Sequence, residues 1–557
     1  MKKLSNEIYA YALENALIFG KAKESAVLPK LFQHGLKKEQ IKDVMPEIQE
    51  KVKEVNSFEE SKLKLHYDNY KKFLKEKPVQ EKGLKELPNV KGKPILRIAP
   101  FPSGSIHIGN SRTFLLNAMY AEKYNGKTIL VIDDTIGSDE KSIMLEAYDL
   151  IPEALKFLKI KYKLPIVYKS DRLEIYYKYA EQLIKKDKAY VCSCSSEELR
   201  ENRLKQVECS CRQYPKEEQM KRWKAMFKAK QGDYILRIKT SMTNSNPAFR
   251  DRVLFRISSK IHPRVGKKYN VWPLLEFSWA IDDHLFKTTH IIRGKELMME
   301  GQMQKYIWDI FGWDYPEIIH NGLIKLEGIG GKLSKSKAQK EVQSGEYIGW
   351  DDPRTWSILS LKRRGILPES IREFVVNLGL TQNDITVPVD DLYSINRKKL
   401  DATSDRYFFV ENPVDIEIKN KQSTKEVEIK LHPEKNKTKT IKVGKIINIS
   451  NDDFQKNKNK EVRLMHLYNI NLSKNLEELS ECSSTENKQK IPKLQWVSNG
   501  VKTRVFMPNG VFKTGLAEPT IKKLKQGDVI QFERFGFCRF DHFDKKENEY
   551  EFWFTHK

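Results

Sequence analysis

The sequence predicts a multidomain protein that joins a parallel α/β core to C-terminal antiparallel β-barrels. Its 557 residues are more than one hydrophobic core usually serves, so we expect three or more domains. A strand, a helix and a second strand follow one another between residues 95 and 134, which is typical of a parallel sheet. After residue 395 the chain changes to short alternating runs separated by turn residues, which indicate antiparallel barrels.

The N-terminal region, residues 1–90, is predicted to be helical. A helical pattern covers 4–19 and ends at Gly20, and Ser57 with Glu60 fits a capping box before a later helix. The region is charged and carries no pattern that suggests chemistry. We therefore expect a docking or scaffold role, with weak protein partners binding through these helices.

The first half of the α/β core is placed at 91–165. Apolar runs at 95–99 and 127–134 each fit a buried strand, and a helical pattern separates them. This order predicts a right-handed βαβ unit. Ligands of such sheets bind beyond the carboxyl ends of the strands, where the stretch PFPSGSIHIGN at 100–110 and Asp133 would both lie.

The rest of the chain is divided by changes of pattern. The mixed region 166–270 is interpreted as an inserted domain, because apolar runs of the core resume only at 271–320. A helical connecting region follows at 321–394. The alternating segments at 395–557 are assigned to the β-barrels.

The charge of the chain suggests a polyanionic partner. The formal net charge is +25 and the pI is about 9.4, and neutralising phosphates releases condensed counterions. Lysine used as ordinary surface residue is the alternative explanation. The apolar stretches are far too short to span a membrane, and the N-terminus lacks the apolar region of a secretory signal. We therefore expect a cytoplasmic protein with no membrane partner.

Two loops have the composition of phosphate-binding segments. In 100–110, Gly104 and Gly109 lack side chains, so a ligand could lie against the backbone at a helix N-terminus, and His107 could donate to a phosphate. The second loop, GGKLSKSK at 330–337, places lysines and serines after two glycines. Taken singly, each has a structural alternative: a loop histidine is usually structural, and a basic loop is usually only exposed.

Four of the six cysteines form two Cys-x-Cys pairs, Cys192 with Cys194 and Cys209 with Cys211. This spacing does not suit a disulfide scaffold in so long a chain. Four thiolates at about 2.3 Å would make a closed structural zinc site. The spacing within each pair is tighter than is common for zinc, so free thiols remain the alternative.

Taken together, the two loops resemble the ATP-binding motifs of class I aminoacyl-tRNA synthetases. Further stretches resemble glutamyl-tRNA synthetases of the archaeal type, and the similarity covers essentially the whole chain. The most specific of them are RIAPFPSGSIHIG at 97–109, IDDHL at 281–285, THIIRGKE at 289–296, GWDDPR at 349–354 and RYFFV at 406–410.

The resemblance implies both an architecture and an activity. It implies a Rossmann-like catalytic core, an inserted domain that contacts the tRNA acceptor end and anticodon-binding β-barrels. Related enzymes also carry a comparable zinc element in the inserted domain. The implied activity is glutamate activation by ATP with Mg²⁺, followed by esterification of the 3′-terminal adenosine of tRNA(Glu).

The resemblance also implies roles for individual residues. His107, Gly109, Lys332 and Lys335 match the catalytic motif positions, with Lys335 more important in the transition state. Asn110 stands where the first motif usually ends in a second histidine. The positions that match the ATP site are Pro100, Gly104, His107, Gly109, Asn110, Lys332, Leu333, Ser334, Lys335 and Ser336.

Glutamate recognition is assigned to three charged residues. Arg293 can hold the side-chain carboxylate bidentately, whereas glutaminyl relatives have an uncharged residue there. Arg97 matches a second carboxylate contact, and Asp133 matches the acid that holds the substrate ammonium. The alternative for Arg293 is an ordinary ion pair.

Several positions near the expected substrate depart from the family pattern. Phe101 stands where the family usually has a small or polar residue. Val131 stands where the family usually has an arginine. Leu275 replaces a residue that is often tyrosine, and Trp279 replaces a residue that is often smaller than tryptophan. A glutaminyl enzyme and a non-catalytic tRNA-binding paralogue are the rival functions, and whether tRNA(Gln) is also charged stays open.

Overall fold

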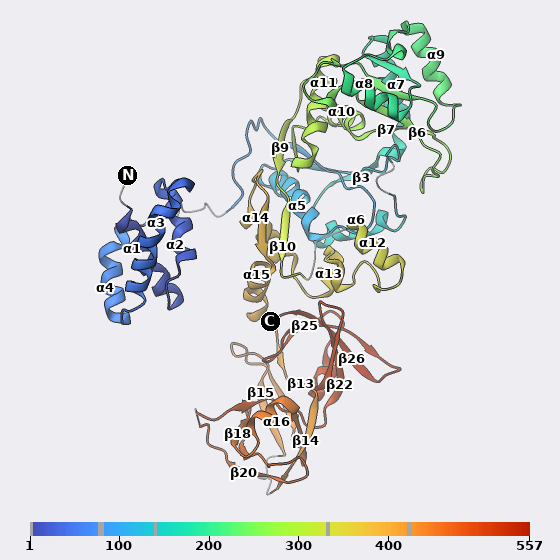
Figure 1. The fold of residues 1–557 in the computed structure, drawn as a ribbon. Helices are drawn as coiled ribbons and strands as arrows, with labels where there is room; N and C mark the ends of the chain where they lie inside the picture. Colours follow the sequence, from blue (N-terminus) through green and yellow to red (C-terminus); the bar gives the residue numbers. More distant parts are fainter. Residues whose placement is uncertain (1–3, 76–82, 139–141, 330–334, 420–424, 489) are drawn as a thin grey trace. The chain divides into compact units, whose positions relative to one another are not determined.

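The computed structural model describes residues 4–75, 83–138, 142–329, 335–419, 425–488 and 490–557. The chain forms two compact units, Met1–Lys82 and Gly83–Lys557 (Figure 1). Within the described ranges, no helix combines the length and the apolar character needed to span a bilayer.

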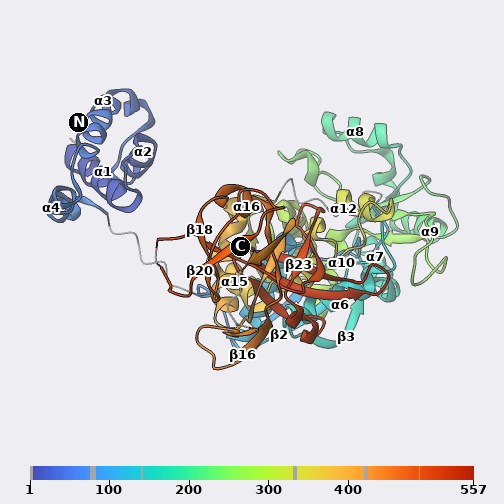
Figure 2. The same cartoon turned by 90° about the horizontal axis from the view of Figure 1, so that it is seen from below.

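The described part of the first unit is built on four α-helices, as the sequence predicts (Figure 2). Gly20 ends the first helix in the left-handed conformation with a φ of 75°, a geometry that costs glycine little. The predicted capping box is wrong, because the Ser57 hydroxyl donates to the Glu54 carbonyl of the preceding helix instead. The helices are α1 (Ser5–Phe19), α2 (Glu24–Leu31), α3 (Ile41–Val55) and α4 (Glu60–Tyr70).

The second unit contains the predicted parallel sheet. Strand β2 pairs in parallel with β1 on one side and with β3 on the other, and α5 connects β1 to β2. The apolar side chains of α5 pack with those of the strands in one buried core. The predicted βαβ unit is therefore confirmed. Its elements are β1 (Ile95–Ile98), α5 (Ile108–Lys123), β2 (Lys127–Ile132), α6 (Ala147–Phe157) and β3 (Lys163–Tyr168).

A second parallel pair extends this layer after the inserted segment. The Thr289 N–H donates to the Ile95 carbonyl at 2.9 Å, so the chain enters β8 beside β1. One helix precedes the pair in sequence, and a second helix connects its two strands. The elements are α10 (Leu275–Leu285), β8 (His290–Gly294), α11 (Met298–Phe311) and β9 (Glu317–Asn321), and β8 pairs with β9.

The segment between the three-stranded parallel sheet and the β8–β9 pair folds around an antiparallel four-stranded sheet. Its buried core is rich in aromatic side chains, including Trp223, Phe255 and Trp272. The elements are α7 (Leu173–Lys185), β4 (Ala189–Cys192), α8 (Ser196–Lys205), α9 (Lys216–Met226), β5 (Ile235–Ile238), β6 (Val253–Ile257) and β7 (Val271–Pro273).

A mainly helical region follows the core, as the sequence predicts. It also contains one short parallel strand pair, β10 with β11. Its elements are β10 (Ile324–Glu327), α12 (Lys335–Gln343), α13 (Ile358–Arg363), α14 (Pro368–Leu378), β11 (Ile385–Pro388) and α15 (Val389–Asp401).

The C-terminal part forms two barrel-like sheets, one of seven and one of six described strands, and a separate antiparallel pair, β15 (Glu426–Lys430) with β16 (Thr438–Lys442). Most pairings are antiparallel, as predicted, but four are parallel: β12 with β24, β22 with β26, β14 with β20 and β18 with β21. The first sheet contains β12 (Arg406–Tyr407), β24 (Val529–Phe532), β25 (Gly536–Asp544), β26 (Glu549–His556), β22 (Val501–Phe506), β23 (Phe512–Ala517) and β13 (Phe409–Glu411). The second contains β17 (Ile446–Ser450), β14 (Pro413–Lys419), β20 (Ser480–Ser484), β19 (Asn469–Asn471), β18 (Glu461–Leu464) and β21 (Lys493–Leu494).

Candidate active site and cysteine cluster

The loop at 100–110 lies between β1 and α5, at the carboxyl end of the strand. His107 is the N-cap residue of α5, and its Nδ1 accepts from the Asn110 N–H at 3.3 Å. A neighbouring segment holds the same turn, because the Ile108 N–H donates to the Trp356 carbonyl at 3.2 Å. His107 therefore stands at a helix N-terminus, where backbone amides favour an anion.

The glycines of this loop have different surroundings. Gly104 has a φ of +125°, and a Cβ added there would lie 2.2 Å from the Trp350 ring. This close approach of Trp350 requires glycine whether or not a ligand is bound. Gly109 lies in the first turn of α5.

The Pro100 carbonyl accepts from the Asp133 N–H at 3.0 Å, which ties the loop to the end of β2.

The second predicted ATP loop falls mostly outside the described residues. Lys332, Leu333 and Ser334 are not among them. Lys335 and Ser336 begin α12, but their side chains also lie outside the description. The roles assigned to these five residues stay predictions.

Arg97 points its guanidinium at a buried acid on α10. Its Nε and Nη2 donate to the two carboxylate oxygens of Asp283 at 2.6 and 3.0 Å. The guanidinium carbon also lies 3.5 Å from the centre of the Trp279 ring. The residue predicted to contact a substrate carboxylate thus already holds one carboxylate bidentately.

Arg293 lies on β8 and is only partly satisfied. Its Nη1 donates to Gln304 Oε1 at 2.6 Å, while Nε and Nη2 have no hydrogen-bond partner among the described residues. A Cβ added at Gly301 would lie 2.6 Å from Nη2, so glycine leaves room for the guanidinium. Burial is the main cause that lowers the pKa of Arg293 to about 10. Two buried N–H-bearing nitrogens without acceptors are what a site for an anion presents.

Asp133 stands at the end of β2 and is occupied by two groups of the protein. Its Oδ2 accepts from the Trp279 indole N–H at 2.9 Å. The same oxygen lies 3.1 Å from the Nζ of Lys169, which also donates to the Ser278 hydroxyl at 2.8 Å. The acid predicted to hold a substrate ammonium therefore holds the ammonium of a lysine.

The structure brings together, around α10, the three residues predicted to contact glutamate, which are Arg97, Asp133 and Arg293. Gln304 links two of them, since its Oε1 accepts from Arg293 and its Nε2 donates to Asp283 at 3.3 Å. Asp283, Gln304 and Lys169 were not identified from the sequence as members of this site. Asp283 could have been suspected from the paired acids of a buried helix, but nothing in the local pattern points to Gln304 or Lys169.

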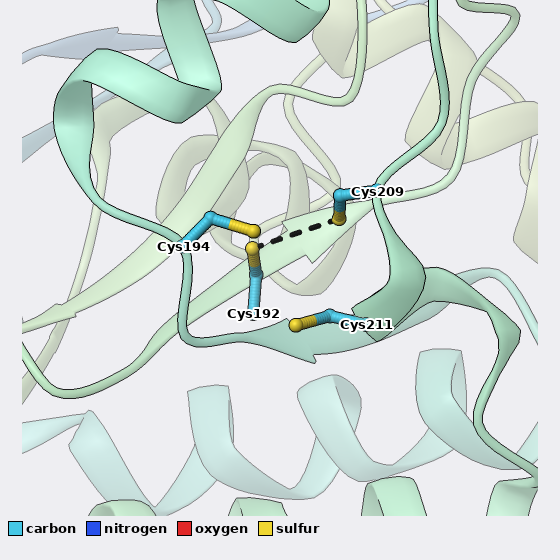
Figure 3. A group of neighbouring side chains, drawn as sticks. All are labelled: Cys192, Cys194, Cys209 and Cys211. Carbon is cyan, nitrogen blue, oxygen red and sulfur yellow. Dashed lines mark hydrogen bonds between the residues drawn. The ribbon is translucent and has the colours of Figure 1, made fainter.

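The four paired cysteines gather in one cluster at the end of β4. Their sulfurs all lie within 4.8 Å of one another, and the side chains from the two segments face a common centre (Figure 3). The sulfurs of Cys192 and Cys209 are 3.8 Å apart. Four sulfurs around one Zn²⁺ at about 2.3 Å would stand about 3.8 Å from each other. The donor set and its spacing thus fit zinc.

One buried side chain directs a donor at these sulfurs. Arg237 Nη1 lies 3.8 Å from the Cys192 sulfur and 3.6 Å from the Cys209 sulfur. The Tyr190 hydroxyl also lies 3.6 Å from the Cys209 sulfur, but it donates its proton to Asp251 at 2.8 Å. A hydrogen bond from Cys192 is the largest cause that lowers the pKa of the Cys209 thiol to about 5, although burial opposes it. The pKa of the Cys192 thiol is raised, mainly by its hydrogen bond to Cys209, and burial raises the pKa of the Cys194 thiol. Without a metal, these contacts favour the thiolate, the form that binds metals, at Cys209.

Comparison with known protein families agrees with this architecture. Residues 95–402 match the model described as tRNA synthetases class I (E and Q), catalytic domain. Residues 404–486 and 483–541 match two models that are each described as the anti-codon binding domain of the same synthetases. The chain therefore belongs to the class I tRNA synthetases of the glutamate and glutamine type.

Relatives similar over nearly their whole length are glutamate–tRNA ligases of archaea. The ligase of Methanocaldococcus jannaschii is 38% identical, and the match covers 98% of each chain. That of Pyrococcus furiosus is 41% identical over 97% of each chain. That of Pyrococcus abyssi is 42% identical over 95% of this chain and 96% of its own. The resemblance to archaeal-type glutamyl-tRNA synthetases is confirmed.

Proposed function

We propose that this protein attaches L-glutamate to tRNA(Glu) through a glutamyl-adenylate, with ATP as the second substrate. The observation that carries the proposal is the buried guanidinium of Arg293, which has two nitrogens without acceptors among the described residues. It lies beside Arg97 in a chain whose full-length relatives are glutamate–tRNA ligases. Glutamate ends in a carboxylate that can accept from such a guanidinium, whereas the glutamine amide cannot match the charge.

The reaction has two steps. An oxygen of the glutamate α-carboxylate attacks the α-phosphorus of ATP, and the bond to the bridging oxygen breaks, so pyrophosphate leaves. A hydroxyl of the terminal adenosine of the tRNA then attacks the carbonyl carbon, and AMP leaves. The protein contributes mainly position and charge. We assign His107 at the N-terminus of α5 to the phosphates and Lys332 with Lys335 to the leaving pyrophosphate. Mg²⁺ carried with ATP neutralises phosphate charge.

We also infer that Cys192, Cys194, Cys209 and Cys211 hold one structural Zn²⁺. The convergence of four sulfurs supports this proposal. An ion with four thiolate ligands has no open position, so it stabilises the inserted segment and takes no part in the chemistry.

The remaining assignments extend the same proposal. We place the inserted segment 166–270 at the tRNA acceptor end and the sheets of 395–557 at the anticodon, with the domain limits that the sequence predicts. The net charge of +25 supports tRNA binding. The protein would act in the cytoplasm. Charging of tRNA(Gln) in addition, and weak protein partners of the N-terminal helices, stay predictions.

The direct test is charging of two transcripts, tRNA(Glu) and tRNA(Gln), with labelled glutamate and separately with labelled glutamine. Glutamate on tRNA(Glu) is the expected result. Glutamate on both would identify a non-discriminating enzyme, and glutamine on tRNA(Gln) or no charging would overturn the proposal. Arg293→Cys should abolish glutamate charging.

A second variant tests the ATP loop. Lys335→Ala should lower glutamate-dependent ATP–pyrophosphate exchange at least about tenfold with a modest change in ATP affinity, because its contact forms mainly in the transition state. Lys340→Ala is the matched control, since Lys340 is exposed on the same helix. Exchange that stays at the wild-type rate in Lys335→Ala would remove the assigned role.

A further inference from the structure

We propose that Trp279 and Lys169 occupy the amino-acid end of the site and that L-glutamate binds by displacing the Trp279 indole and taking the place of the Lys169 ammonium at Asp133. The inference rests on the proposed function and adds two residues that determine the affinity for the amino acid. It follows from burial, from the partners of Asp133 and from the position of the indole.

The groups expected to bind glutamate are closed to solvent. The relative exposure is 7% for Arg97, 5% for Asp133 and 4% for Arg293, and it is 3% for Trp279 and 0% for Lys169. A polar substrate cannot reach these groups while the side chains that cover them stay in place. Some side chain must therefore move before glutamate binds.

Lys169 already makes the contacts that a substrate ammonium would make. It follows β3 directly, and its Nζ lies 3.1 Å from Asp133 Oδ2, 2.8 Å from the Ser278 hydroxyl and 3.7 Å from the Trp279 ring centre. An ammonium has three donors, and these three neighbours satisfy it. Asp133 Oδ2 contacts both Lys169 and the Trp279 indole, and Oδ1 accepts from the Thr135 hydroxyl at 3.4 Å. A substrate ammonium that takes Oδ2 therefore competes with the lysine.

Trp279 separates the two ends of the expected substrate. Its ring lies 3.5 Å from the Arg97 guanidinium and 3.7 Å from the Lys169 ammonium, and its N–H donates to Asp133. A glutamate that reaches Arg97 with its side chain and Asp133 with its ammonium must cross the space that the indole fills. An aromatic residue serving only the apolar core would not be placed between two cations and a carboxylate.

The internal contacts must therefore be broken when glutamate binds, and this lowers the apparent affinity for the amino acid. Trp279 and Lys169 are not among the residues assigned to ATP. The inference thus predicts an effect on glutamate binding and not on ATP binding.

The experiment measures binding of L-glutamate to the full-length protein by calorimetry for the wild type, Trp279→Ala and Trp279→Phe. Trp279→Ala should lower the Kd about tenfold, because it removes a desolvated cation–π contact that glutamate otherwise has to break. Trp279→Phe keeps a ring between the cations and should stay within about threefold of the wild type. Equal or weaker glutamate binding by folded Trp279→Ala, judged by circular dichroism, would overturn the proposal.

Two further measurements keep the test decisive if Trp279→Ala does not fold. Lys169→Gln preserves a donor to Asp133 without the charge and should also bind glutamate more tightly. In wild-type protein labelled with 5-fluorotryptophan, the fluorine signal of Trp279 is the one that is missing from the Trp279→Phe spectrum. Saturating glutamate should shift this signal. Looser binding in Lys169→Gln, or an unmoved signal, would contradict the inference.

Failure of this inference is distinguishable from failure of the proposed function. Wild-type protein that charges tRNA(Glu) while the variants gain no affinity keeps the function and removes the roles of Trp279 and Lys169. Wild-type protein that charges neither tRNA, with glutamate binding recovered in Trp279→Ala, supports the displaced side chains and removes the proposed function.

Discussion

His556, the last residue of β26, should titrate far below an ordinary histidine. It is 1% exposed, and burial is the main cause that lowers its pKa from 6.5 to about 4. The Asn396 amide donates to its Nε2 at 2.9 Å, because the Asn396 oxygen already accepts from the Leu367 N–H and the Ser370 hydroxyl. The ring proton is therefore assigned to Nδ1, which donates to the Lys557 carbonyl at 3.0 Å. Protonation of Nε2 would break the bond from Asn396.

The sign of the stability effect follows from the two pKa values. The unfolded chain binds a proton near pH 6.5, and the folded chain binds it only near pH 4. The contribution of His556 to the free energy of unfolding is therefore fully present above pH 6.5, and it is lost as the pH drops from 6.5 toward 4. One pH unit corresponds to about 1.36 kcal/mol. The loss of unfolding free energy is therefore about 2 kcal/mol at pH 5 and about 3 kcal/mol once the pH is below 4.

Two measurements check this prediction. In protein labelled with ¹³C-histidine, the signal that disappears in His556→Gln should titrate near pH 4. Urea unfolding followed by tryptophan fluorescence should show that the wild type loses about 2 kcal/mol more than His556→Gln between pH 7 and pH 5. A His556 signal that titrates near 6.5, or an equal loss in the variant, would refute the reasoning.

Two other predictions concern the cysteine cluster and the contact between α13 and the C-terminal sheet. Metal analysis should find one zinc per chain. Cys211→Ser should lower the zinc content, whereas Cys482→Ser, which lies outside the cluster, should not. Wild-type protein without zinc would contradict this prediction. Arg363→Ala removes a bidentate contact with Asp541 at 2.9 and 2.7 Å and should destabilise the protein by about 3 kcal/mol in urea, because the acid is nearly buried. Lys362→Ala, which breaks only an exposed pair with Glu153, is the control and should cost less than about 1 kcal/mol.

The parts of the fold that could be predicted are those encoded by local periodicity. The strands β1 and β2 are short apolar runs on either side of a helical pattern, and consecutive strands joined by a helix usually lie side by side in a parallel sheet. Each Cys-x-Cys pair places two cysteines near each other through spacing alone, and the structure brings the two pairs into one cluster. The capping box failed because Ser57 had a competing backbone acceptor in Glu54, which the sequence pattern does not reveal.

The contacts that could not be predicted join segments far apart in the chain. Lys169 meets Asp133 and Trp279 only after β2, β3 and α10 have packed together, and no spacing in the sequence records that meeting. The same holds for Gly104, whose need for glycine comes from Trp350. The family resemblance pointed to Arg97, Asp133 and Arg293, whose roles stay predictions, whereas the side chains that contact these residues required the structure.

The helix α13 contacts both the loop at 100–110 and the C-terminal sheet. At its start, the Ile358 N–H donates to the Ile106 carbonyl at 2.8 Å, one residue before His107. At its end, Arg364 Nη2 donates to the Thr555 carbonyl of β26 at 2.8 Å. The helix itself is only Ile358–Arg363, and a hydrogen-bonded turn of this length does not stretch. The six residues of α13 therefore connect the loop at 100–110 to β26, and a displacement of β26 would strain either the arginine contact or the backbone bond at Ile106.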